Sequence, residues 1–205
     1  MLRQLLFTSI ILALITNYAG AQRDSARNHL MIVPSYFSNN ALRIDYEVNI
    51  GKRHWLQLSP QYYFGNTEFY TSYHSDYELN NLSGYGLDID HKIYVSPGRK
   101  FRPGTYFSYG IAFNYLTIQY TNTEGTQPIK QSQSFPKIGG DLMIGFDFAA
   151  PFSKFPVIFG PYAGIGYRYS FTDDAGIKKH FTKSYYDFAY SGNLFIFGFK
   201  IGAWF

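Results

Sequence analysis

The last twelve residues of the chain, Leu194 to Phe205, alternate between two kinds of side chain. Counted back from Phe205, every second residue is apolar, whereas the positions between them include Gly198, Lys200 and Gly202. Because successive side chains of a β-strand point to opposite faces, this segment predicts a long strand with one apolar face and one small or polar face. A fold built from such strands must offer a different environment to each face of its sheet.

The same alternation recurs along the chain in stretches of about ten residues separated by turn-rich breaks, and no segment after Ala21 has a helical period. Eight such stretches predict strands at about 29–37, 41–50, 54–64, 84–95, 104–120, 135–148, 157–171 and 189–205. The breaks after the second, fourth and sixth stretches are short, and those after the third, fifth and seventh are long and polar. The chain therefore predicts an all-β fold, an eight-stranded antiparallel up-and-down transmembrane β-barrel with both termini at the short-turn end.

Residues 1–21 predict a cleaved secretory signal peptide. A short positive start precedes an apolar run over residues 5–15, which is too short to cross a bilayer as a helix. Ala19-Gly20-Ala21 then forms a small-x-small cleavage pattern. We expect secretion through the Sec route, cleavage after Ala21 and a barrel domain over residues 22–205; a retained N-terminal anchor is the alternative.

The composition points to a membrane barrel as well. Forty residues are Tyr or Phe, although the mean hydropathy is slightly negative. Aromatic girdles at the two membrane interfaces need such a content. The absence of cysteine excludes disulfides, thiolate metal ligands, a cysteine nucleophile and a lipidated cysteine. The modest net charge of +4, without a run of Lys or Arg, gives no indication of nucleic-acid binding.

Charged residues gather on one face of the predicted strands. Arg43, Asp45 and Glu47 share the parity opposite to the apolar residues of the second strand. A Lys or Arg facing lipid near the midplane costs about 2–4 kcal/mol, so in a membrane the charged face must point into the lumen. The residues predicted to form this lumen charge network are Arg43, Asp45, Glu47, Asp88, Asp90, Lys92, Asp141, Asp147, Arg168 and Lys200. Eight strands enclose room for little more than side chains, so we expect a filled lumen; a narrow ion path is the alternative.

Three prolines, Pro34, Pro60 and Pro161, fall inside predicted strands. Proline lacks the N–H that a strand ladder requires, and a closed barrel has no free edge on which to place it. We expect a bulge or a strand end at each of them.

No catalytic, cofactor-binding or metal-binding motif stands out. The five histidines form no H-x-H or H-E-x-x-H pattern, so no metal site is predicted. Gly84-Tyr85-Gly86 and Gly164-Ile165-Gly166 precede no helix and are not phosphate loops. We expect no cofactor.

The third break contains a candidate partner-binding hairpin. Strand alternation continues through residues 68–79, with Asn80-Asn81 as the expected turn. Its aromatic residues Phe69, Tyr70, Tyr73 and Tyr77 would lie above the membrane, where free strand edges can bind partners by strand addition. An ordinary mobile loop is the alternative.

The short breaks carry basic residues and no acid. These residues are Lys52, Arg53, Arg99, Lys100, Arg102 and Lys154. Basic groups at a membrane surface attract anionic lipid head groups, so we expect contact with the phospholipid of the leaflet that faces these turns.

The signal peptide, the eight alternating segments, the loop asymmetry and the terminal Phe205 together resemble small eight-stranded outer-membrane proteins, the OmpA-barrel and OmpX-like group within the outer membrane protein beta-barrel families. The resemblance implies the outer membrane of a Gram-negative-type bacterium, with both termini periplasmic and outer-membrane lipid around the barrel. In that group a C-terminal aromatic strand is read by the barrel assembly machinery. By resemblance, Ile201, Ala203 and Phe205 would form that signal.

Three functions are open at this point. The first is a non-enzymatic, porin-like surface barrel that offers extracellular loops to a partner or serves as a subunit of an envelope complex. The second is a lipid-modifying barrel enzyme; such enzymes place a histidine and a serine on the outer face, but no serine lies two residues from His91. The third is a soluble periplasmic lipocalin-like binding barrel, with apolar residues inside and charges outside.

Overall fold

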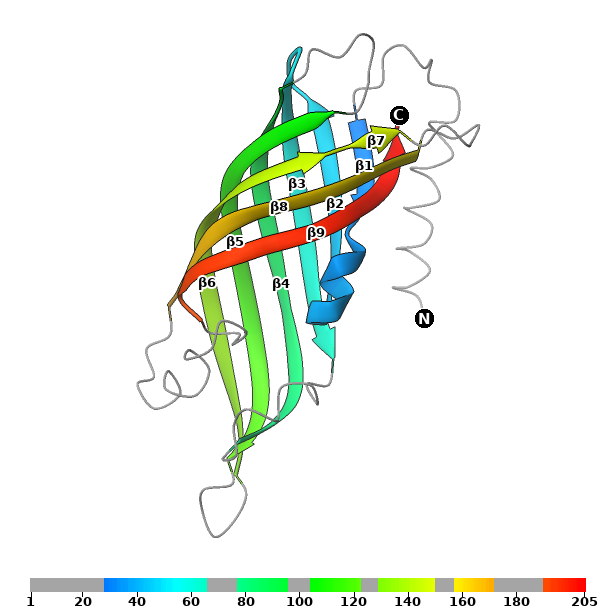
Figure 1. Cartoon of the computed structure of the whole chain (residues 1–205). Coiled ribbons are helices and arrows are strands. Elements are labelled where there is room, and N and C mark those ends of the chain that lie inside the picture. The colour runs from blue at the N-terminus through cyan, green and yellow to red at the C-terminus, as the bar shows by residue number, and fades with distance from the viewer. Residues whose placement is uncertain (1–27, 66–76, 96–103, 123–128, 150–156, 172–189) are drawn as a thin grey trace.

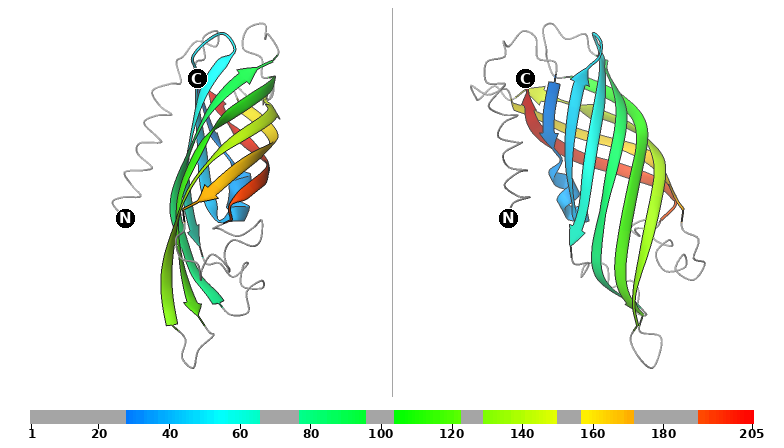
Figure 2. Two further views of the ribbon diagram at one scale, coloured as in Figure 1. Left: turned by 90° about the vertical axis from the view of Figure 1, so that its left-hand side faces the viewer. Right: turned by 180° about the vertical axis from the view of Figure 1, so that it is seen from behind.

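The computed structural model describes residues 28–65, 77–95, 104–122, 129–149, 157–171 and 190–205. In these ranges the chain forms one antiparallel sheet that closes on itself (Figures 1 and 2). Its elements are β1 (Asn28–Ile32), η1 (Pro34–Asn39), β2 (Ala41–Asn49), β3 (His54–Gly65), β4 (Tyr77–Tyr94), β5 (Thr105–Asn122), β6 (Ile129–Phe146), β7 (Phe148–Ala149), β8 (Val157–Ser170) and β9 (Gly192–Trp204). The predicted fold class, an all-β eight-stranded up-and-down barrel, is confirmed.

Consecutive strands pair with each other except β6 and β7, which both pair with β8, and the pairing of β1 with β9 closes the barrel. β1 pairs with β9, and the backbones of Asn28 and Phe205 exchange hydrogen bonds of 3.0 and 3.1 Å. β8 pairs with β6 over Lys137–Gly145 and then, in the same register, with the two-residue β7. β7 therefore continues β6, so the nine strands form the eight strand positions of the barrel wall. The start of β1, the end of β9 and the β2–β3 turn lie at one end of the barrel, which we name the turn end (Figure 1).

The first strand is shorter than predicted. β1 stops at Ile32, and residues 34–39 form the 3₁₀ helix η1 instead of a strand that reaches Phe37. Proline at the start of a helical turn leaves no donor unsatisfied, because the first N–H groups of a helix have no partner within it. The helix ends at Asn39, and the next residue, Asn40, adopts the left-handed conformation at φ 51°. The expected strand end at Pro34 is thus correct.

The expectation of bulges or strand ends at Pro60 and Pro161 is wrong. Pro60 pairs with Leu87 inside β3, and Pro161 pairs with Phe199 inside β8. On its other side each proline faces an interrupted ladder whose register stays the same. The β2–β3 pairing omits Ile44 and Asp45, and β6 gives way to β7 opposite Pro161. The missing donor therefore costs local hydrogen bonds without a shift of the chain.

Strands β4, β5 and β6 extend beyond the others at the end opposite to the turn end (Figures 1 and 2). β4 pairs with β3 only from Leu82 onward, and β6 pairs with β8 only from Lys137 onward. The predicted hairpin turn at Asn80-Asn81 is wrong, because both residues lie inside β4, where the register shifts between Leu79 and Asn81. Asn80 accommodates this bulge by donating a 2.7 Å hydrogen bond to Thr121 Oγ1.

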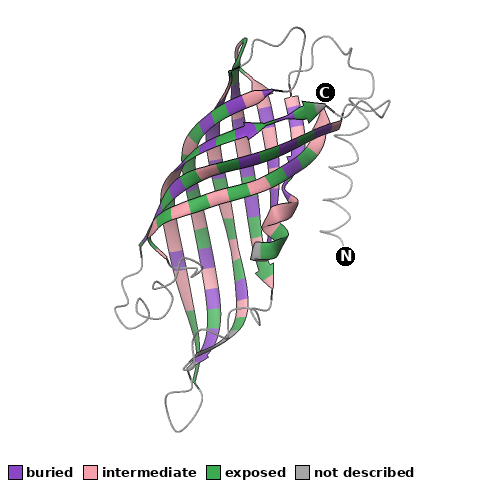
Figure 3. Ribbon diagram, viewed as in Figure 1, coloured by how far each residue is buried: buried purple, intermediate pink, exposed green. Residues whose placement is uncertain are grey.

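Burial alternates along the strands, as Figure 3 shows. In β2, residues Ala41, Arg43, Asp45 and Glu47 are buried, and the residues between them are not. The outer positions of β5 to β9 carry exposed aromatic and aliphatic side chains, and Phe197 is 80% exposed. Within the described ranges, no helix is long and apolar enough to span a membrane.

Candidate functional site: the charged barrel interior

All ten charged residues that alternation assigned to the lumen lie inside the barrel. Each is at most 8% exposed, and Glu47 and Lys92 are fully buried at 0%. They come from β2, β4, β6, β8, β9 and the short link at Asp147, so that residues distant in sequence meet across the lumen. Two ion-pair networks and one separate pair result, and the two networks are joined where Lys200 Nζ lies 3.6 Å from Asp45 Oδ2.

Glu47 is the centre of the first network, which lies in the half of the barrel nearer the turn end. Lys92 Nζ lies 3.0 Å from each Glu47 carboxylate oxygen, and Lys200 Nζ lies 2.9 Å from Oε1. His29 Nδ1 lies 2.9 Å from Oε2. Lys92 also reaches Asp147 at 2.5 Å, and Asp147 accepts a hydrogen bond from the Tyr94 hydroxyl. Two carboxylates and two ammonium groups balance each other here.

The ring of Tyr106 lies beneath the two lysines of this network. Lys92 Nζ is 3.8 Å and Lys200 Nζ is 5.2 Å from its centroid. An aromatic face attracts a cation, more strongly where water is excluded. Tyr106, itself buried, therefore compensates in part for the desolvation of both ammonium groups.

Arg43 is the centre of the second network. Its Nε donates to Asp45 Oδ1 at 2.7 Å, and its Nη1 donates to Asp88 Oδ2 at 2.6 Å and to the Tyr36 hydroxyl at 2.7 Å. Nη2 lies 4.0 Å from Asp90 Oδ2. One guanidinium thus serves three carboxylates, which suits its five donors in a planar fork.

Arg168 and Asp141 form a separate bidentate pair across β6 and β8. The two Arg168–Asp141 hydrogen bonds measure 2.5 and 2.7 Å. Two parallel hydrogen bonds fix the orientation of both groups. This pair is neutral as a unit.

The interior therefore has a surplus of acid. Of the ten residues six are acidic and four basic, and the surplus lies around Arg43. Asp88 Oδ1, Asp90 Oδ1 and Asp147 Oδ1 are buried and have no hydrogen-bond partner among the described residues. A buried ionised group with an unfilled acceptor is costly. Such acceptors occur in both networks, at Asp88 and Asp90 around Arg43 and at Asp147 beside Lys92.

Small residues make room for the interior carboxylates. Along one row of the sheet, Asp90 of β4 pairs with Gly110 of β5, Gly110 with Asp141 of β6, and Asp141 with Gly166 of β8. A Cβ atom at Gly110 would meet Asp90 Oδ1, and one at Gly166 would meet Asp141 Oδ1. Alternation of carboxylate and glycine across four strands lets the charged groups share one narrow lumen.

Sequence reasoning missed several polar residues that complete these networks. Gln57 donates to Ser59 at 2.9 Å and to Asp90 at 3.2 Å, and it accepts from Lys200 at 2.9 Å. Gln61 donates to Asp88 at 2.7 Å. The signal was present in the third strand, where Gln57, Ser59 and Gln61 alternate with Leu56, Leu58 and Pro60. These uncharged residues and His29 share the inward parity of the charged set and differ from it only in formal charge.

The other predicted residues lie elsewhere. Ile201 is outward and partly exposed on β9, while Ala203 and Phe205 are half-buried where β9 meets β1. Of the hairpin residues, Phe69, Tyr70 and Tyr73 fall outside the described residues, as do residues 1–21, and Tyr77 is the first residue of β4. Among the basic turn residues the structure describes Lys52 and Arg53, which are both exposed.

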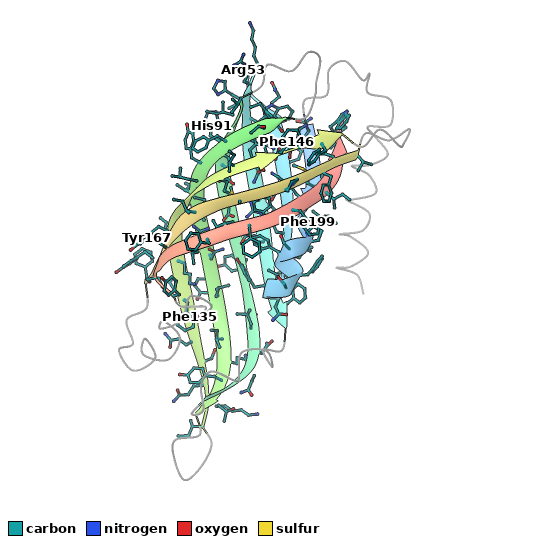
Figure 4. The ribbon with its side chains drawn as sticks, viewed as in Figure 1. Arg53, His91, Phe135, Phe146, Tyr167 and Phe199 are labelled. Carbon is teal, nitrogen blue, oxygen red and sulfur yellow. The ribbon has the colours of Figure 1, made fainter. Side chains whose placement is uncertain are left out.

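His91, which shares its parity with Ile89 and Ile93, is on the outer wall near the turn end (Figure 4). Its partners are His54 at 3.1 Å and the Tyr109 hydroxyl at 2.8 Å. Ser83, the exposed serine of the same strand, is eight residues away, about 26 Å along an extended strand. Among the described residues, no group of three His, Asp or Glu side chains could hold a metal ion.

These pairings define the class of the protein as a closed eight-stranded up-and-down β-barrel with a charged interior. No family model and no curated protein matches the chain. Among solved structures it is similar to the crystal structure of CarO from Acinetobacter baumannii; the sequence identity is 12%, the match covers 90% of this chain and 99% of CarO, and the TM-score is 0.40. A likeness at that level supports no conclusion about function. Membership of the OmpA-barrel and OmpX-like group stays a prediction.

Proposed function

We propose that this protein is an integral outer-membrane barrel without enzymatic activity, whose lumen is filled by its own side chains and whose long loops meet a partner at the cell surface. One observation carries the proposal: charged side chains occupy the inner face of the sheet, and apolar side chains occupy its outer face. The six acidic side chains of the lumen charge network point inward, whereas Tyr85, Phe195 and Phe197 are each more than 60% exposed. In water such an outer face would be an aggregation hazard, and in a bilayer it is the required surface.

The interior supports a closed rather than a conducting barrel. Lys92 joins Glu47 of β2 to Asp147 beyond β6, and Lys200 of β9 joins the same Glu47 to Gln57 of β3. These contacts cross the lumen between strands that are not neighbours. An eight-stranded barrel leaves little space beyond such side chains.

The soluble lipocalin-like alternative does not fit this sorting. A ligand-binding barrel of that kind holds apolar residues inside and presents polar residues to water. Here Asp45 and Lys200 are buried, and Phe199 of the same strand as Lys200 is exposed. A lipid-modifying activity finds no support at His91, whose described partners are a histidine and a tyrosine rather than a serine.

The membrane assignment is tested by producing the protein with residues 1–205 in a Gram-negative host and fractionating the envelope. We expect the mature chain in the outer-membrane fraction, resistant to carbonate extraction and shifted in electrophoretic mobility by boiling. Recovery as a soluble periplasmic protein would contradict the proposal.

The proposed role of the loops is tested separately, by mild-detergent purification of the intact protein beside a variant in which residues 172–189 are replaced by a short turn. We expect a specific co-purifying envelope protein with the intact chain only. Identical partners for both proteins would exclude this loop as the binding surface.

A further inference from the structure

Three polar side chains from three neighbouring strands form a hydrogen-bonded chain on the outer wall. His54 of β3, His91 of β4 and Tyr109 of β5 lie side by side, because His91 pairs with Tyr109 and His54 pairs with Ile93 two positions further along. His54 Nδ1 lies 3.1 Å from His91 Nε2, and His91 Nδ1 lies 2.8 Å from the Tyr109 hydroxyl. The two imidazole rings stack, with centroids 5.1 Å apart and planes at 12°.

This chain must present a free donor to its surroundings. If Tyr109 donates to His91, then His91 donates to His54, and the Nε2–H of His54 points away from the chain. If the direction is reversed, the Tyr109 O–H is the free donor. One extra proton on His91 makes both ends donors at once. The arrangement is therefore suited to an anion that accepts hydrogen bonds at the wall.

The surrounding charge favours the same kind of ligand. Lys52 and Arg53 are exposed in the turn that directly precedes His54, and Figure 4 shows Arg53 and His91 at the same end of the barrel. The six acidic side chains of the lumen charge network are buried, so that none of these six carboxylates competes for the outer donors. Beyond His91 toward the middle of the barrel, the outer wall of β4 and β5 is apolar, with Leu87 and Ile111 exposed.

We propose that His54, His91 and Tyr109, together with Lys52 and Arg53, bind the phosphate of an anionic phospholipid in the leaflet that surrounds the turn end. The inference rests on the membrane insertion proposed above. The acyl chains of the lipid lie along the apolar wall, and its phosphate lies at the level where the wall changes from apolar to polar. Basic residues near a membrane surface attract anionic lipid, and the donor chain adds a fixed contact point to that attraction.

Native mass spectrometry of the detergent-solubilised protein with added phosphatidylglycerol, in the presence of EDTA, tests the proposal. The His54→Ala/His91→Ala double variant should bind phosphatidylglycerol about tenfold more weakly, which corresponds to one hydrogen bond to a charged group. Tyr109→Phe, which removes a hydroxyl from an exposed position, should also weaken the binding of phosphatidylglycerol. Unchanged binding in both variants would overturn the proposal.

Tyr115→Phe is the matched control, because Tyr115 is another outward tyrosine of β5 and stacks on Tyr85 at 5.4 Å. It should bind phosphatidylglycerol as the wild type does; an equal loss in this variant would show that the effect is not specific to the site. Excess inorganic phosphate should leave the lipid adducts of the wild type in place. Displacement by phosphate would mean a site for free anions and would overturn the assignment to lipid.

The same samples separate this proposal from the membrane assignment. Insertion into liposomes and the mobility shift on boiling report on the barrel itself, whatever its head-group preference. A wild type that fails to insert contradicts the proposed function. A wild type that inserts but binds phosphatidylglycerol no better than the double variant contradicts only the lipid site.

Discussion

Lys92 Nζ lies 3.0 Å from both carboxylate oxygens of Glu47, although β3 separates the two strands that carry these residues. The pair therefore spans the lumen over the inner face of β3. With Lys200 on the same carboxylate, it connects β2, β4 and β9 through a single side chain. Glu47 is the residue on which the interior of the turn-end half depends.

Replacement of Glu47 by Gln should destabilise the barrel strongly. The change removes the carboxylate that serves two buried ammonium groups, and breaking a buried pair in this way costs about 3 kcal/mol or more. Chemical unfolding of the protein in detergent micelles measures the difference. Lys130→Gln, at an exposed position of β6, is the control and should have little effect. Equal stability of the two variants would contradict a structural role for the network.

Gly110→Ala should also lower stability, because the new methyl group would meet Asp90 Oδ1 and the carbonyl oxygen of Ile89. Overpacking of this kind costs about 1–3 kcal/mol. Gly51→Ala is the matched control, since a Cβ atom there meets only His54, at an ordinary distance of 3.7 Å. The denaturant midpoints of unfolding of the two variants give the comparison. An unchanged midpoint for Gly110→Ala would show that the lumen can accept a methyl group beside Asp90.

The filled lumen predicts an electrically silent barrel. Planar lipid bilayers that contain the purified protein should show no discrete conductance steps above protein-free bilayers, because ion pairs cross the lumen at Glu47 and Arg43. Reproducible ohmic steps that scale with protein concentration would contradict a closed interior and favour a narrow ion path.

If Phe205 is part of an assembly signal, as the resemblance implies, it should affect how efficiently the barrel is inserted and not the stability of the folded protein. Phe205→Ser should reduce the amount of protein that reaches the outer membrane, whereas the refolded variant in detergent should keep its mobility shift. Phe159→Ser removes an exposed aromatic residue of β8 and serves as the control. If both variants reach the membrane equally well, the terminal residue has no special role in assembly.

The sequence predicted the sorting of side chains better than it predicted the ends of strands. A charge at the lipid face is so costly that the parity of Asp45 or Lys92 determines the orientation of a whole strand. No comparable penalty marks where a strand stops. β4 therefore continues seven residues beyond its predicted start at Gly84, and Asn80-Asn81 form a bulge rather than a turn.

The site was predictable in its members but not in its pairings. Alternation places Glu47, Lys92 and Lys200 inside, yet their contact depends on strand order and on the stagger of β2, β4 and β9. The outer chain of His54, His91 and Tyr109 was hidden for the same reason, since its members come from three strands and form no sequence motif. The prediction of bulges or strand ends at Pro60 and Pro161 failed because a strand ladder can lose hydrogen bonds at a proline without a change of register.

The central claim is that apolar side chains face lipid while charged ones face the lumen, and two adjacent residues of β5 test it most directly. Phe107 is 40% exposed and Tyr106 is 2% exposed at nearly the same height on the wall. In a background in which Trp55 and Trp204 are replaced by Phe, single tryptophans are introduced as Phe107→Trp and Tyr106→Trp, and each protein is reconstituted into liposomes with brominated acyl chains. Strong quenching of the tryptophan at position 107 and little at position 106 is the predicted result; the reverse order, or equal quenching, would contradict the account.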